Sequence, residues 1–292
     1  MTRALVLGGG GPVGVGWESG LAVGLAKAGV ALGDADLVVG TSAGSIVGSR
    51  LALGLDLTET VSAVGQPLPV EVSAGATIAD LMTAWASAAS RAQTPEQMRI
   101  ELGKLALGAP TVAEGDFTGA AVFAQLAGSG WPASFRCTAI DAKTGALRVW
   151  DAEAGASLDR AVAASCAVPM VFPPVTVDGA RYMDGGMRTP LNADLAAGHT
   201  AVIIVSCLAM ALPEGITDPV FEATAAQIEA ELAVLRGSGA SVEIIVPGAE
   251  FLEVSGWGAE LMNPSRVAGA YEAGVRQAVA EAGRLQAIWS AS

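Results

Sequence analysis

The sequence has few of the residues on which many common site chemistries depend. Of 292 residues only one is histidine and three are cysteine, and none of them form a CxxC or Cys/His cluster. Neither a zinc site nor a disulfide framework is therefore expected. Acidic residues outnumber basic ones 29 to 16, and the net charge of −13 disfavours nucleic acid and anionic membranes as partners. We expect no metal and no cofactor.

Long apolar runs are also scarce. The amino-terminal stretch before the first glycines is too short for a signal peptide. The longest later run, residues 201–212, is interrupted by Ser206 and falls short of the roughly 20 residues of a membrane-spanning helix. Cys137, Cys166 and Cys207 are far apart and fit buried, reduced thiols. We therefore expect a cytoplasmic protein, with transient contact with a membrane left open.

Small apolar residues dominate what is present. Hydrophobic residues make up 52% of the chain but aromatics only 5%, so we expect a core of small side chains with closely packed helices. Residues 4–7 and 36–39 predict buried strands, and residues 17–28 and 43–53 predict helices. This alternation is typical of a mainly parallel sheet between helices, a three-layer α/β/α fold. A single domain over 1–292 is the simplest count.

The rest of the chain resumes this pattern after one interruption. Residues 55–130 are Ala-rich, helical in pattern and broken by Pro67, Pro69, Pro95 and Pro110, which predicts a helical insertion that can cover a site. Further predicted elements are strands at 135–140, 147–150, 201–206 and 242–246, a hairpin of 175–177 and 181–183 around Asp178-Gly179, and helices at 158–168, 221–236 and 265–288.

Gly40-Thr41-Ser42-Ala43-Gly44 lies between a predicted strand and a predicted helix. A G-x-S-x-G turn at such a junction exposes the serine hydroxyl beside a helix amino terminus, which favours developing negative charge. The pentapeptide alone is weak evidence in a chain with 37 glycines, and a helix-capping serine is the alternative. We take Ser42 as the candidate nucleophile of a serine hydrolase.

A glycine-rich segment, Gly8-Gly9-Gly10-Gly11-Pro12-Val13-Gly14, follows the first predicted strand. Successive backbone N–H groups in such a loop can hold a phosphate or an oxyanion. Three of the glycines also match the dinucleotide pattern G-x-G-x-x-G, which needs an acid at the end of the second strand. Here Asp34 and Asp36 come before that strand, so the oxyanion interpretation is favoured over nucleotide binding.

Asp184 ends a predicted strand and is followed by Gly185 and Gly186. An aspartate beside two glycines is by default a turn residue. The only histidine, His199, precedes the strand at 201–206, whereas sites in parallel sheets gather at the carboxyl ends of strands. We expect His199 at the surface, so a serine nucleophile would need a carboxylate as its base.

These three motifs, in this order, resemble the patatin-like phospholipase family. The resemblance runs from residue 4 to about residue 205 and includes Ser165-Cys166-Ala167-Val168-Pro169 and Phe172-Pro173-Pro174. It implies a patatin-like fold and a serine acyl hydrolase that cleaves lipid-like carboxylic esters through an acyl-enzyme. Because the sequence shows no metal-binding cluster, we expect no calcium dependence. The residues that the resemblance assigns are Ser42 as nucleophile, Asp184 as general base, and the N–H groups of Gly9, Gly10 and Gly11 as oxyanion hole.

One departure from the family leaves an alternative open. The family's glycine loop usually carries Arg or Lys before its last glycine, where this chain has Val13, and Pro12 removes an N–H donor. Arg50 and Arg188 cannot be placed from the sequence. The alternative is a weak or inactive member of the family that binds lipid or a protein partner.

An acyl chain would need an apolar channel. The insertion carries apolar side chains that can line such a channel or form ordinary helix core: Leu81, Met82, Trp85, Met98, Leu102, Leu105 and Leu107.

Overall fold

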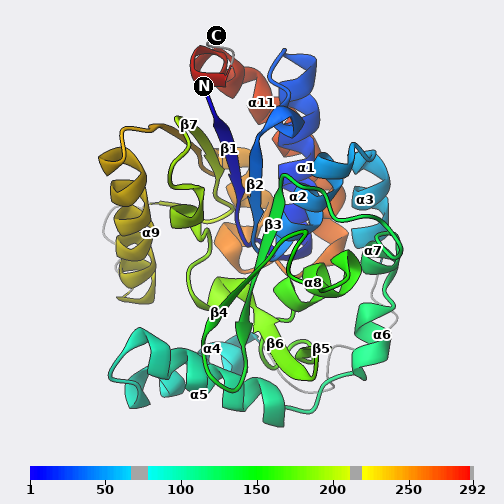
Figure 1. The fold of residues 1–292 in the computed structure, drawn as a ribbon, viewed down its shortest axis with the longest axis vertical. Helices are drawn as coiled ribbons and strands as arrows, with labels where there is room; N and C mark the ends of the chain where they lie inside the picture. Colours follow the sequence, from blue (N-terminus) through cyan, green and yellow to red (C-terminus); the bar gives the residue numbers. More distant parts are fainter. Residues whose placement is uncertain (67–77, 211–218, 290–292) are drawn as a thin grey trace.

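A computed structural model describes residues 1–66, 78–210 and 219–289, and these build one eight-stranded sheet between helices (Figure 1). The five strands from β3 to β8 in sheet order are parallel, and β4, β5 and β6 join antiparallel, so the predicted mainly parallel α/β fold is confirmed. In sheet order the strands are β5 (Val175–Val177), β6 (Ala180–Asp184), β3 (Phe135–Asp141), β2 (Leu37–Gly40), β1 (Arg3–Leu7), β7 (Ala201–Val205) and β8 (Ser241–Ile245), with β4 (Leu147–Trp150) paired to β3.

Helices cover both faces of the sheet because its central strands are apolar on both sides. Leu5 and Leu7 of β1 face one core cluster, whereas Ala4 and Val6 face another. Against the first face pack α1 (Gly11–Lys27), α2 (Ala43–Leu53), α8 (Leu158–Ser165), α10 (Ala249–Val254) and α11 (Val267–Trp289); against the second pack α9 (Pro219–Gly237) and the short η3 (Ala193–Ala196).

The predicted insertion is helical in its described residues. Its helices are α3 (Leu57–Val64), α4 (Ile78–Arg91), α5 (Pro95–Gly108), α6 (Glu114–Thr118) and α7 (Ala121–Ala124). Pro67, Pro69 and the side chains of Leu81 and Met82 lie outside the described part. Leu102 is buried against Ile140 and Met183 in a cluster that Trp85, Met98 and Leu105 complete, whereas Leu107 is 45% exposed. Apart from Leu107, the described side chains therefore form helix core against β3 and β6.

Several predicted boundaries shift in the structure. The first helix begins at Gly11 and not at residue 17, because Gly10 takes the N-cap position and Pro12 is tolerated in the first turn. Helix α8 ends at Ser165, three residues before the predicted end, because Pro169 disfavours helical geometry at the residue before it. The hairpin turn is confirmed, with positive φ at both Asp178 and Gly179.

The remaining short helices are single 3₁₀ turns, and sequence patterns did not predict them. They are η1 (Leu32–Asp34), η2 (Gly185–Met187), η4 (Gly256–Gly258) and η5 (Pro264–Arg266). Over the described ranges, we find no helix with the length and apolar content needed to cross a membrane. The three cysteines are buried and unpaired, as predicted.

Candidate active site

Ser42 lies on the sharp turn between β2 and α2, at φ 53° and ψ −117°. Such a conformation is strained for a residue with a side chain and is the geometry of a nucleophile elbow. The flanking glycines are required because a Cβ on Gly44 would lie 2.1 Å from the Leu7 carbonyl oxygen, and one on Gly40 would lie 2.6 Å from the Gly44 carbonyl oxygen. The G-x-S-x-G sequence therefore lets α2 start directly against β1 and β2.

The backbone of Ser42 is held by side chains on both sides. The Ser165 hydroxyl oxygen accepts a hydrogen bond from the Ser42 N–H at 2.9 Å. The Ser42 carbonyl oxygen accepts from the Ser45 hydroxyl at 2.7 Å and from the Cys166 thiol at 3.3 Å. Sequence reasoning found the Ser165-Cys166 segment only as part of a family resemblance and gave it no role.

Strand register brings Asp184 level with Ser42. Gly40 of β2 is paired with Cys137 of β3, and Ala139 of β3 is paired with Asp184 of β6. Ser42 lies two residues beyond Gly40, and Ala139 lies two residues beyond Cys137. Ser42 and Asp184 are therefore level with each other along the strands. Ser42 and Asp184, 142 positions apart in the sequence, therefore lie together at the carboxyl ends of the parallel strands.

Asp184 is 2% exposed, and both its backbone and its carboxyl group are hydrogen-bonded. Its N–H donates to the Ala167 carbonyl at 2.9 Å, and its Oδ1 accepts from the Gly186 N–H at 2.7 Å. Burial raises the pKa of Asp184 to about 6, against the opposing effects of hydrogen bonds from the Ser42 side chain and the Gly186 N–H. The carboxyl group is thus ionised at neutral pH and is a stronger base than an ordinary aspartate.

The glycine loop lies beside Ser42 but offers fewer N–H groups than predicted. A Cβ on Gly9 would lie 3.6 Å from the Ser42 Cβ, yet the Gly9 N–H donates to the Pro190 carbonyl at 2.9 Å. The prediction that Gly9 donates a hydrogen bond to the oxyanion is therefore corrected, because its N–H group already donates to Pro190. No acceptor within the described ranges takes the N–H of Gly10 or Gly11, which begin α1. Ser42 caps the amino terminus of α2, and Gly9 beside it leads into the amino terminus of α1, so both helix ends favour negative charge near Ser42.

The residue in place of the family's basic side chain is buried. Val13 is fully enclosed, and its N–H donates to the Leu261 carbonyl at 3.1 Å. The Arg50 guanidinium donates to backbone carbonyls of α2 and the α7 segment, and burial lowers its pKa to about 10. Arg188 is paired with Asp194 at 2.7 Å. Neither arginine takes the place of the missing basic residue.

A buried acid that the sequence reasoning missed lies under the glycine loop. Glu18 of α1 is 1% exposed, and its Oε1 accepts a hydrogen bond from the Cys207 thiol at 3.6 Å. Burial raises the pKa of Glu18 well above its ordinary value. The same Cys207 sulfur would meet a Cβ on Gly10 at 2.5 Å, so this pair supports the loop from beneath.

His199 and Asp36 lie at the amino-terminal ends of the parallel strands, opposite the end at which Ser42 lies. His199 precedes β7, and its Nδ1 is 3.1 Å from the Ala196 carbonyl oxygen. Asp36 precedes β2 and accepts the Arg3 N–H at 2.7 Å. A dinucleotide site would need that acid at the carboxyl end of β2, which is where Ser42 follows. Among described residues no three His, Cys, Asp or Glu side chains are grouped so that they could hold a metal ion.

A family model described as "Patatin-like phospholipase" matches residues 5–197. The chain therefore belongs to the patatin-like phospholipase family, a family of lipid acyl hydrolases. The match confirms the resemblance that the glycine loop, the Ser42 turn and the Asp184 turn carry.

Comparison with known proteins adds two solved structures. The crystal structure of VipD from Legionella pneumophila is 15% identical with a TM-score of 0.43, and the match covers 97% of this chain and 67% of that one. The type III effector protein ExoU is 13% identical with a TM-score of 0.37, with coverage of 95% and 53%. No curated protein matches the chain.

Proposed function

We propose that this protein is a serine acyl hydrolase that cleaves lipid-like carboxylic esters with Ser42 as nucleophile and Asp184 as general base. The observation that carries the proposal is the strand register that brings Ser42, on its strained turn, to the same end of the sheet as the buried carboxyl group of Asp184. Nucleophile and base must be within hydrogen-bond reach for such a dyad to work. Because His199 lies at the opposite ends of the strands from Ser42, the base is a carboxylate.

The proposed cycle has two steps. Ser42 Oγ attacks the ester carbonyl carbon while Asp184 accepts the hydroxyl proton, and the alcohol leaves with that proton to give an acyl-enzyme. Asp184 then takes a proton from water, which attacks the acyl carbonyl carbon, and passes that proton to Ser42 Oγ as the bond from Oγ to the acyl carbon breaks and the carboxylic acid leaves. In both steps the oxyanion is held by the N–H groups of Gly10 and Gly11, each worth roughly 10²–10³ in rate for a donor of this kind.

The alternative is a weak or inactive family member that binds lipid or a protein partner. The commitment of the Gly9 and Val13 N–H groups to backbone carbonyls favours it, since both reduce the donors available to an oxyanion. Two N–H groups and two helix amino termini are left for this purpose, which is enough for the reaction as proposed.

A fluorophosphonate probe separates the two functions because it reacts only with activated serines. We expect it to label the wild-type protein and not Ser42→Ala. Asp184→Asn should lose hydrolysis of a p-nitrophenyl ester, whereas His199→Ala, the matched control, should keep it. An unlabelled wild-type protein would establish the binding alternative. A chain-length series of p-nitrophenyl esters, followed by a phospholipid panel, then defines the substrate.

A further inference from the structure

Asn192 lies between the two turns that carry Ser42 and Asp184. Its side-chain Nδ2 donates to the Thr41 hydroxyl oxygen at 3.1 Å and to the Gly185 carbonyl at 3.3 Å. Thr41 precedes Ser42, and Gly185 follows Asp184. Asn192 is fully buried, so these bonds are formed without competition from solvent. One amide group thus connects the residue before the nucleophile to the residue after the base.

The amide orientation of Asn192 is set by its surroundings. Its Oδ1 accepts from Arg188 at 2.9 Å, and its Nδ2 faces only oxygen atoms, including the Thr189 carbonyl at 3.1 Å. Exchanging the amide O and N would bring oxygen against oxygen and nitrogen against guanidinium. The backbone of Asn192 is left-handed at φ 53°, a conformation that asparagine tolerates better than most residues.

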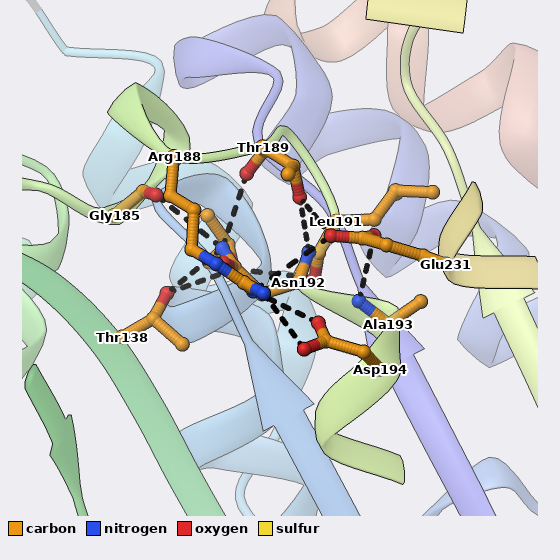
Figure 2. A network of polar contacts seen from close by, with 10 residues as sticks. Thr138, Gly185, Arg188, Thr189, Leu191, Asn192, Ala193, Asp194 and Glu231 are labelled. Carbon is orange, nitrogen blue, oxygen red and sulfur yellow. Dashed lines mark hydrogen bonds and ion pairs between the residues drawn. The ribbon is translucent and has the colours of Figure 1, made fainter. Parts of the chain in front are cut away.

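A second layer of polar groups lies around Asn192 (Figure 2). Arg188 forms two hydrogen bonds to Asp194, at 2.8 and 2.7 Å. Glu231 of α9 accepts from the Thr189 hydroxyl at 2.6 Å and from the Ala193 N–H at 2.9 Å. The Asn192 N–H in turn donates to the Thr189 hydroxyl oxygen at 2.8 Å. The position of Asn192 is therefore fixed from α9 as well as from its own loop.

Packing of the core alone does not explain why polar groups are buried around Asn192. Burying the Asn192 amide and the Glu231 carboxylate costs desolvation energy that an apolar core of equal volume would avoid. The two hydrogens of the Asn192 amide lie among four oxygen atoms, two of which belong to the Thr41 and Thr138 hydroxyls. Those hydroxyls also bond to each other at 2.9 Å, which fixes Thr41 against β3.

We infer that Asn192 is a positioning residue that sets the distance between the Ser42 hydroxyl and the Asp184 carboxylate, an inference that rests on the proposed function. Through Thr41 it fixes the turn that presents Ser42. Through Gly185 it fixes the turn that presents Asp184. Loss of either bond lets the two turns move independently, and misplacement by about 1 Å can cost roughly 10²-fold in rate.

Two substitutions of Asn192 test this role. Asn192→Gly keeps the left-handed backbone and removes the amide. Asn192→Asp keeps the shape and the oxygen that faces Arg188 but removes both donated hydrogens. In both variants we expect the rate of fluorophosphonate labelling and kcat for a p-nitrophenyl ester to fall roughly 10- to 100-fold with KM unchanged. The final stoichiometry of labelling should stay that of the wild type, because the protein is folded and Ser42 is present.

A control separates positioning from stability. Leu25→Ala removes a fully buried side chain near the far end of α1 and should lower the melting temperature while the labelling rate stays that of the wild type. Wild-type labelling rates in both Asn192 variants would overturn the positioning role and leave the proposed function intact. A fall in stoichiometry at an unchanged rate would overturn it too, since that result means partial unfolding. An unlabelled wild-type protein would overturn the proposed function itself.

Discussion

The Ser165 hydroxyl oxygen accepts the hydrogen bond of the Ser42 N–H at 2.9 Å, and both residues are buried. Ser165→Ala would leave that N–H without an acceptor, which costs about 1–3 kcal/mol of unfolding free energy. It would also release the strained backbone of Ser42, so we expect kcat to fall roughly 10-fold or more. Ester hydrolysis and urea unfolding, measured on the same preparation, give both numbers.

Cys166 provides a conservative comparison for Ser165. Cys166→Ser keeps a donor to the Ser42 carbonyl oxygen and should retain most activity, whereas Cys166→Ala removes it. Equal activity in Ser165→Ala and the wild type would show that the Ser42 backbone does not depend on this contact.

The pH dependence of hydrolysis should report Asp184. Its carboxyl group must be ionised to accept the Ser42 proton, and burial raises its pKa to about 6. We therefore expect kcat/KM to be level above pH 7 and to fall about tenfold for each pH unit well below 6. A pH–rate profile with an uncharged ester checks this. An acid limb centred near 4 would mean that Asp184 is not the titrating base.

Asp184 should also destabilise the folded protein at neutral pH. Its folded pKa of about 6 lies above its ordinary value of 3.8, so unfolding is favoured once the group ionises. Below about pH 3 the carboxyl group is protonated in both states and the effect vanishes. The unfolding free energy of Asp184→Asn relative to wild type should therefore rise by up to about 3 kcal/mol between about pH 3 and pH 7, at 1.36 kcal/mol per pKa unit.

Denaturant unfolding at a series of pH values measures this difference. Ser42→Ala keeps the buried carboxyl group and should keep the pH-dependent loss of stability. A constant difference between Asp184→Asn and wild type across the range would contradict burial as the cause of the raised pKa.

The closeness of α2 to β1 gives a steric prediction. In Gly44→Ala the new Cβ would lie 2.1 Å from the Leu7 carbonyl oxygen, which cannot move without breaking the sheet. We expect a loss of at least 1–3 kcal/mol, or no folded protein. Gly283→Ala in α11 is the matched control, since the new Cβ would meet no atom within 4 Å. This substitution should raise the unfolding free energy by up to about 1 kcal/mol, because alanine favours the helix more than glycine does. Thermal unfolding of both variants distinguishes them.

Local signals in the sequence predicted α2 to the residue and the Asp178-Gly179 hairpin, because short-range turn chemistry determines both. The start of α1 was missed because a glycine run is typical of a loop. That helix is stabilised by α11, whose backbone approaches so closely that a Cβ on Gly20 would lie 2.0 Å from the Tyr271 carbonyl oxygen. This contact spans about 250 residues and has no local signal.

In the candidate site, too, the features set by local sequence were predicted and those set by long-range contacts were not. Ser42 and Asp184 follow from motifs, each of which comes with its own turn. The engagement of the Gly9 N–H by Pro190 depends on a loop that returns to the site 181 residues later, and no spacing rule predicts it. Asn192 was missed because its side-chain partners Thr41, Thr138 and Gly185 come from three segments far apart from one another in the sequence.

The place of β1 in the sheet has a consequence for synthesis. β1 is made before β7, yet its Arg3 pairs with Ala201, which comes 198 residues later in the sequence. Until β7 is made, the backbone N–H and C=O groups on that edge of β1 are unpaired, which leaves the edge open to pairing with other chains. A fragment cut after residue 197, where the family match ends, would carry both Ser42 and Asp184 but would keep that edge open permanently.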